Sequence, residues 1–224
     1  MKLPSDDSIT VRKLPVFLLV DVSESMNGPG IMQANEGLRT FVEDLRSDQA
    51  GNIVLMTLMT FSDKAKTVFQ FQEPSAIQLR QLITEGRTEL DLALHALCDL
   101  VAGQPKDLIR DLKAPLLCII TDGNPTCTDA SLDAAIDRLN NDSFFGRSST
   151  TNSPRGFRLI CGAGSEQDVS EEVLESLIHS KEAGAVKRLH DVNSLKLFFH
   201  YLNTLTRQIT MNKPISLDDD LVNS

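Results

Sequence analysis

The sequence contains few aromatic residues, few cysteines and no long apolar run. These features limit the classes of protein to which the chain can belong. Its 224 residues include no tryptophan, one tyrosine and four cysteines. No segment approaches the roughly 20 consecutive apolar residues of a membrane-spanning helix. Residues 1–7 also lack the apolar centre of a signal peptide. These absences predict a cytoplasmic protein.

The cysteines form no C-x-x-C pair, the spacing that would point to a metal or redox motif. Cys98, Cys118 and Cys161 lie in apolar runs, where we expect reduced core residues. Cys127 follows Thr126 in a loop, and we expect an inert thiol there, with a redox role as the alternative.

Basic residues are outnumbered, with 22 Lys and Arg against 31 Asp and Glu and a formal net charge of −9. Because binding to phosphate groups needs a basic surface, this balance argues against nucleic acids and anionic membranes as partners. Hydrophobic residues make up 41% of the chain, enough for one substantial core, and no linker divides it. We predict an N-terminal extension over 1–13, one domain over 14–211 and an acidic tail over 212–224.

Common catalytic motifs are missing as well. There is no G-x-x-x-x-G-K-[ST] phosphate loop and no G-x-S-x-G nucleophile elbow, and the four histidines have no metal-ligand spacing. Gly162-Ala163-Gly164 lacks the third glycine of a dinucleotide loop and is better interpreted as a turn. We therefore predict that the chain is not an enzyme.

What is present is an apolar run, Val16 to Val20, that ends abruptly at Asp21, with hydroxyls following at Ser23 and Ser25. Such a run predicts a strand buried on both faces. Carboxylate and hydroxyl oxygens on alternate loop residues suit a small hard cation such as Mg²⁺. The alternative is that one of the serines only caps the next helix.

A second apolar run, 115–121, also ends in an aspartate, Asp122, and Thr88 opens a helical pattern between the two runs. In an open parallel sheet the ligand crevice lies beyond the carboxyl ends of the strands. Asp21 and Asp122 could therefore lie side by side at that edge, with Thr88 reaching in from a neighbouring loop.

Together these residues resemble the von Willebrand factor A domain and its metal-ion-dependent adhesion site, whose motif is D-x-S-x-S followed by a distant Thr and a distant Asp. More narrowly, residues 14–23, 35–38 and 121–126 look like the bacterial tellurium-resistance TerY type. The metal ligands that the resemblance implies are Asp21, Ser23, Ser25, Thr88 and Asp122.

The resemblance implies a module that binds Mg²⁺, with Mn²⁺ or Ca²⁺ as alternatives, and recognises a partner protein through a carboxylate that completes the metal's coordination. The TerY likeness implies a bacterial tellurite or chemical-stress response, with partners from a kinase and phosphatase system. A metal-dependent phosphatase or phosphotransferase with Asp21 as nucleophile, and a structural domain whose metal only braces the loops, stay open as alternatives.

Two residues depart from the family's usual pattern. Glu24 stands between the two serines where Gly is frequent, and Arg87 replaces the second glycine of a common Gly-Gly-Thr arrangement. These charged side chains put the choice of partner in doubt. Arg87, Glu89 and Asp91 could rim the metal site, although solvated surface is the simpler interpretation.

Strand-like and helix-like runs alternate along the chain, which favours a doubly wound α/β domain with a mostly parallel sheet, one antiparallel edge strand and helices on both faces. We expect strands at 14–21, 52–61, 66–71, 115–121, 156–164 and 185–189, and helices at 31–45, 77–83, 88–102, 131–139, 173–178 and 195–209. Residues 140–155, rich in Ser, Thr, Asn and Gly, are expected to form a mobile surface loop.

Overall fold

A computed structural model of the chain describes residues 12–148, 151–163, 170–178, 180, 183–189, 194–213 and 215. Most of the expected N-terminal extension and nearly all of the acidic tail lie outside these residues, as do Gly164, His179 and His190. The predictions made for those positions stay predictions.

The described residues form one six-stranded sheet. Its strands are β1 (Leu14–Asp21), β2 (Val54–Phe61), β3 (Ala65–Gln72), β4 (Leu116–Thr121), β5 (Phe157–Ala163) and β6 (Gly184–Leu189). Across the sheet the order is β3-β2-β1-β4-β5-β6. Every pairing is parallel except that of β2 with β3, which is antiparallel and lies at the edge. The expected fold class is confirmed.

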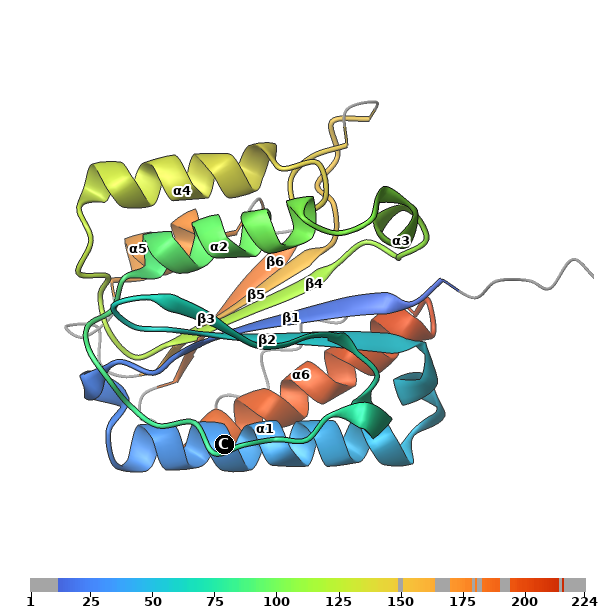
Figure 1. The fold of residues 1–224 in the computed structure, drawn as a ribbon, viewed down its shortest axis with the longest axis horizontal. Coiled ribbons are helices and arrows are strands. Elements are labelled where there is room, and N and C mark those ends of the chain that lie inside the picture. Colours follow the sequence, from blue (N-terminus) through green and yellow to red (C-terminus); the bar gives the residue numbers. More distant parts are fainter. Residues whose placement is uncertain are drawn as a thin grey trace, which may run out of the picture.

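Helices cover both faces of this sheet (Figure 1). They are α1 (Pro29–Ser47), α2 (Leu90–Ala102), α3 (Lys106–Arg110), α4 (Asp129–Asn141), α5 (Glu171–Ser176) and α6 (Leu195–Thr210), with short 3-10 turns η1 (Glu24–Met26), η2 (Gln49–Ile53) and η3 (Pro74–Ala76). The pair α1 and α6 packs on one face, and α2 and α4 pack together on the other. Within the described part of the chain no helix is long and apolar enough to cross a membrane.

β1 is buried along its whole length because it lies between two apolar layers. Side chains alternate across a strand, so Leu18 faces the core beneath α1 and α6, and Phe17 and Leu19 face the core beneath α2 and α4. An apolar run without polar interruption therefore belongs at the centre of the sheet, as the sequence predicted.

The prediction of a helix at 77–83 is wrong. After η3 this segment runs without regular structure across α1, where Ile77 and Leu82 are buried in the core. The Asn35 side chain donates to Leu82 O (2.9 Å) and accepts from Leu82 N (2.7 Å). Arg46 donates to the carbonyl oxygens of Pro74 (2.8 Å) and Ile77. Side chains of α1 thus satisfy backbone groups that a helix would have paired internally.

The surface loop expected at 140–155 is only partly confirmed. Its first residues finish α4, and the next turn buries Phe144 and Phe145, which contact the Phe17 ring edge-on. The short helix α3 was also not predicted. Arg158, only 2% exposed on β5, donates to Phe145 O (3.2 Å) and Asn140 Oδ1 (2.7 Å). This buried guanidinium holds the turn against the domain.

Candidate metal centre

The site lies where the central strands end. β1 ends at Asp21 and its neighbour β4 ends at Thr121, one residue before Asp122. From β1 the chain continues to β2 on one side, and β4 lies on the other, so this is the point where the strand order reverses. The turns and helix starts that follow β1 and β4 gather at the left of Figure 1.

Asp21 is completely buried, and both of its carboxylate oxygens accept hydrogen bonds. Oδ1 accepts from the backbone N–H of Ser23 (2.8 Å) and Oδ2 accepts from the Thr121 hydroxyl (2.7 Å). Burial raises the pKa of Asp21 to about 6, although the bonds from Ser23 and Thr121 act in the opposite direction. The nearby Asp122 carboxylate adds a smaller upward effect. A buried carboxylate with an elevated pKa is a group whose charged form a cation would stabilise.

Ser23, Ser25 and Asp122 form a continuous chain of oxygens. The hydroxyls of Ser23 and Ser25 are 2.9 Å apart, and Ser25 Oγ donates to Asp122 Oδ1 at 2.7 Å. Ser23 precedes η1 but makes no side-chain capping bond, and α1 begins after Gly28 without a side-chain cap. The capping alternative for the serines is therefore wrong, and their hydroxyls point into the cluster.

Thr88 comes from the loop before α2, and backbone bonds dock that loop on the turn after β1. Glu85 N donates to Val22 O (2.7 Å), and Glu24 N donates to Gly86 O (2.9 Å). Thr88 is buried, and its own carbonyl accepts from Thr126 N (2.8 Å). Residues far apart in sequence are thereby held at one edge.

Gly86 is needed in this loop. Its φ of +68° is a left-handed conformation, and a Cβ there would lie 2.4 Å from Asp63 Oδ2. Asp63 Oδ1 accepts from Arg87 N (2.9 Å), which fixes the turn that leads to Thr88.

The two departures from the family pattern point outward. Glu24 is exposed, and the Arg87 side chain is 73% exposed, with its guanidinium 3.6 Å from both the Asp63 and the Glu89 carboxylates. They therefore leave the five predicted ligand positions in place.

The five residues meet the chemical needs of a hard divalent cation. All their side-chain donors are oxygens, two of them carboxylates. A Cβ on Gly123 would lie 3.5 Å from Ser25 Oγ and 3.7 Å from Thr88 Oγ1, so both hydroxyls border the same small space beside Asp122. The residues present fit an oxygen-coordinated ion.

Two features of the edge were missed from the sequence. Thr121, whose hydroxyl donates a hydrogen bond to Asp21, was not predicted to take part in the site. Asp91, interpreted most simply as solvated surface with the rim of the metal site as the alternative, is only 6% exposed. The first could have been suspected because a hydroxyl one residue before Asp122 ends the strand next to Asp21. The burial of Asp91 depends on how α2 packs against α4, which no local pattern reveals.

The model of the von Willebrand factor type A domain family matches residues 16–200. This chain belongs to that family. The match includes five complete strands, most of β1 and all five candidate ligands, so the likeness to the A domain expected from the sequence is confirmed at family level.

Solved structures with this A-domain fold include the ArnB paralog VWA2 from Sulfolobus acidocaldarius, 18% identical with a TM-score of 0.55 over 91% of this chain and 46% of that one. The D319A mutant of the PilB minor pilin from Streptococcus sanguinis is 10% identical, with a TM-score of 0.67 over 91% of this chain and 64% of that one. Proximal thread matrix protein 1 from the mussel byssus, with a zinc-occupied MIDAS motif, is 15% identical, with a TM-score of 0.58 over 88% and 48%.

At these identities the structures establish the fold alone. The chain spans between 46% and 64% of the length of these three relatives.

Proposed function

We propose that this A domain binds one divalent cation through Asp21, Ser23, Ser25, Thr88 and Asp122. The preferred ion is Mg²⁺, with Mn²⁺ or Ca²⁺ as alternatives. The observation that carries the proposal is the run of oxygens from Asp21 through the serines to Asp122 at the ends of β1 and β4. The zinc-occupied MIDAS motif of the mussel protein supports it, as an occupied metal site on the same fold.

The bound ion serves recognition of a partner protein. Ser25 is exposed while Asp21 and Ser23 are buried, so an ion held between them is reached from solvent on one side. With neutral hydroxyls as several of its ligands, the ion keeps enough positive charge to attract one more anionic oxygen. A carboxylate from an acidic side chain of the partner fits that position.

Catalysis by Asp21 as a nucleophile is less well supported. Its exposure is 0% and both oxygens already accept hydrogen bonds, so a phosphate ester has no open path to it. The residue two positions on is Ser23, which cannot serve as the acid or base of an aspartyl-phosphate mechanism. We propose a non-enzymatic module.

The narrower part of the proposal is a cytoplasmic role in a bacterial tellurite or chemical-stress response, beside kinase and phosphatase partners. Its support is the likeness of residues 14–23, 35–38 and 121–126 to the TerY type. We also propose 14–211 as the bounds of the domain.

The test uses the full chain loaded with Mn²⁺, whose bound water speeds the relaxation of solvent protons. We expect added acetate to lower this enhancement by displacing a metal-bound water, and isosteric acetamide to leave it unchanged. The Thr88→Ala variant should show little enhancement. Equal effects of acetate and acetamide would contradict carboxylate recognition, and turnover of p-nitrophenyl phosphate lost in Asp21→Asn would instead support an enzyme.

A further inference from the structure

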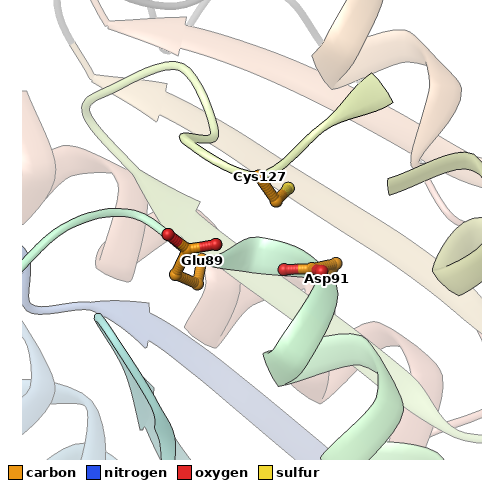
Figure 2. Close-up of side chains that lie close together, drawn as sticks. All are labelled: Glu89, Asp91 and Cys127. Atoms are coloured by element: carbon orange, nitrogen blue, oxygen red, sulfur yellow. The ribbon is translucent and has the colours of Figure 1, made fainter. Parts of the chain in front are cut away.

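A second cluster of ligand-type side chains lies beside the first, where α2 begins. Glu89, Asp91 and Cys127 each offer one ligand atom, and these three atoms all lie within 4.8 Å of one another. Figure 2 shows the three side chains converging, two from the start of α2 and one from the loop before α4. None of them was among the ligands expected from the family motif.

Asp91 brings a buried carboxylate to this cluster, whereas the Glu89 carboxylate already has the Arg87 guanidinium 3.6 Å away. The Asp91 side chain is 6% exposed, and one carboxylate oxygen accepts a hydrogen bond from Ser131 Oγ. The other, Oδ1, is buried and has no hydrogen-bond partner among the residues that the structure describes. A buried carboxylate oxygen without a partner is costly, and a cation is the group that would compensate it best.

Hydrogen bonds from neighbouring residues already hold the side chains and loops of this cluster in place. Thr126 ties the two loops together twice, with its N–H on Thr88 O (2.8 Å) and its hydroxyl on Glu89 Oε1 (3.0 Å). Ser131 on α4 fixes the second oxygen of Asp91. In metal sites, hydrogen bonds of this kind to the ligating side chains fix their orientation.

We propose that Glu89, Asp91 and Cys127 form a second metal site, selective for a borderline-soft transition metal of the Zn²⁺ kind. One thiolate and two carboxylates are ligands that Zn²⁺ accepts and that Mg²⁺, which demands oxygen only, does not. In a tetrahedral Zn²⁺ site the ligand atoms are about 3.5 Å from one another. The distances between the three ligand atoms would therefore have to shorten by on the order of 1 Å when the ion binds.

The cluster supplies three ligands and leaves a fourth position open toward solvent. Glu89 is 17% exposed at its side chain and Cys127 is half-buried, so an ion there can be reached from outside. Water, or a donor from a partner, completes the coordination. The site does not depend on the Asp21 centre, because the two share no ligand.

Metal binding here displaces the thiol proton to solvent. Burial raises the pKa of the Cys127 thiol, the backbone N–H of Asp91 lowers it, and the Asp91 carboxylate raises it again. A bound cation replaces the repulsion between thiolate and carboxylate by attraction to both.

The experiment is a Co²⁺ titration of the full chain after removal of metals. Cobalt bound to a thiolate gives a charge-transfer absorption in the near ultraviolet, whereas cobalt bound only to the oxygens of the Asp21 centre does not. We expect one equivalent of Co²⁺ to produce this band and Zn²⁺ to remove it by displacement. A folded wild-type chain that gives no such band would overturn the proposal.

Variants assign the band to the cluster. Cys127→Ser should abolish it, and Asp91→Asn and Glu89→Gln should each weaken Co²⁺ binding by at least the roughly 10–100-fold that loss of a residue supporting a metal ligand costs. Asp129→Asn, which removes an exposed carboxylate from the first turn of α4, is the matched control and should bind like wild type. A band that survives Cys127→Ser would place the thiolate elsewhere and contradict the site.

Asp21→Asn separates this proposal from the adhesion-site proposal. The variant should lose Mg²⁺ binding and keep the cobalt–thiolate band. Because Glu89 is less buried than Asp91, Glu89→Gln tests the site even if the Asp91 variant fails to fold, and circular dichroism checks the fold of each.

Discussion

Asp21 carries a burial penalty that the proposed ion would remove. The free side chain has a pKa of 3.8, and burial in the fold raises it to about 6. The carboxylate is therefore less stable in the metal-free fold than in water, in spite of the hydrogen bonds that it accepts from Ser23 and Thr121. Ion binding and proton binding compete for this one group.

Mg²⁺ affinity should therefore fall as the pH drops below about 6, by up to about tenfold per pH unit, because a proton must leave Asp21 before the ion can bind. Calorimetric titration at two pH values on either side of 6 measures this. Equal affinities at both would show that Asp21 is not a ligand.

The raised pKa of Asp21 also determines how the stability of the metal-free chain depends on pH. Since the folded pKa lies above the unfolded one, the contribution of Asp21 to stability is full below pH 3.8 and is lost as the pH rises through about 6. Asp21→Asn removes this dependence and should be at least as stable as wild type at neutral pH in a chelator. Thermal unfolding across that range checks it, and a less stable Asp21→Asn would argue against the burial penalty.

The backbone conformation of Gly86 is expected to matter for both stability and Mg²⁺ binding. Gly86→Ala should cost about 1–3 kcal/mol and weaken Mg²⁺ binding, because the left-handed backbone and the close approach of Asp63 both exclude a Cβ. Gly103→Ala is the control, since φ there is −76° and a Cβ would meet its nearest neighbour at 3.4 Å. Chemical denaturation and calorimetry compare the two, and equal losses in both would contradict a specific role for the turn at Gly86.

At the scale of elements, the segment from Ile77 to Ile83 shows how α1 overrides local preference. Its spacing of apolar residues predicted a helix, but Asn35 and Arg46 bind its backbone and draw Ile77 and Leu82 into the core. The segment leads directly to Glu85 and Gly86, which dock on the turn after β1. Packing on α1 therefore helps to position Thr88.

Two neighbouring residues test this packing. Leu82→Ala should lower the free energy of unfolding by about 2–5 kcal/mol, because Leu82 is 8% exposed. Ile83→Ala should change it by less than about 0.5 kcal/mol, because Ile83 is 73% exposed. Urea denaturation of both variants gives the comparison. Similar losses in the two would mean that the segment does not pack as described.

These elements also show what the sequence can predict. Buried strands were predicted from continuous apolar runs, which suit the centre of a sheet. Four of the candidate ligands were suggested because they follow two of those runs, and Thr88 was suggested because it opens a helical pattern. The turn at Phe144 and Phe145 was misjudged, since its polar neighbours hide two aromatic side chains that Arg158 holds in place. The grouping of Glu89, Asp91 and Cys127 was equally hidden, because it depends on the docking of two distant loops.

At the scale of the whole molecule, the sheet order brings the site together. β1 lies between β2 and β4, so the loops that follow β1 and β4 diverge to opposite faces and leave an edge between them. Each proposed ligand follows a strand or precedes a helix at that edge. An ion bound there ties together loops that carry residues 21–25, 88 and 122, and so stabilises the folded chain.

Mg²⁺ should accordingly raise the free energy of unfolding of the whole domain, by about 2.7 kcal/mol at a hundredfold excess over its dissociation constant. The shift should vanish in a chelator and in Thr88→Ala. Thermal unfolding with and without Mg²⁺ measures it, and a shift that persists unchanged in Thr88→Ala would point to binding elsewhere.

A calorimetric Mg²⁺ titration of the metal-stripped chain, with Asp21→Ala, Thr88→Ala and Cys127→Ser in parallel, tests the proposed metal site most directly. We expect one bound ion, whose binding is weakened by the first two substitutions and unaffected by the third. Binding that survives both Asp21→Ala and Thr88→Ala, or a folded wild-type chain that binds no Mg²⁺ with or without acetate, would contradict the proposed site.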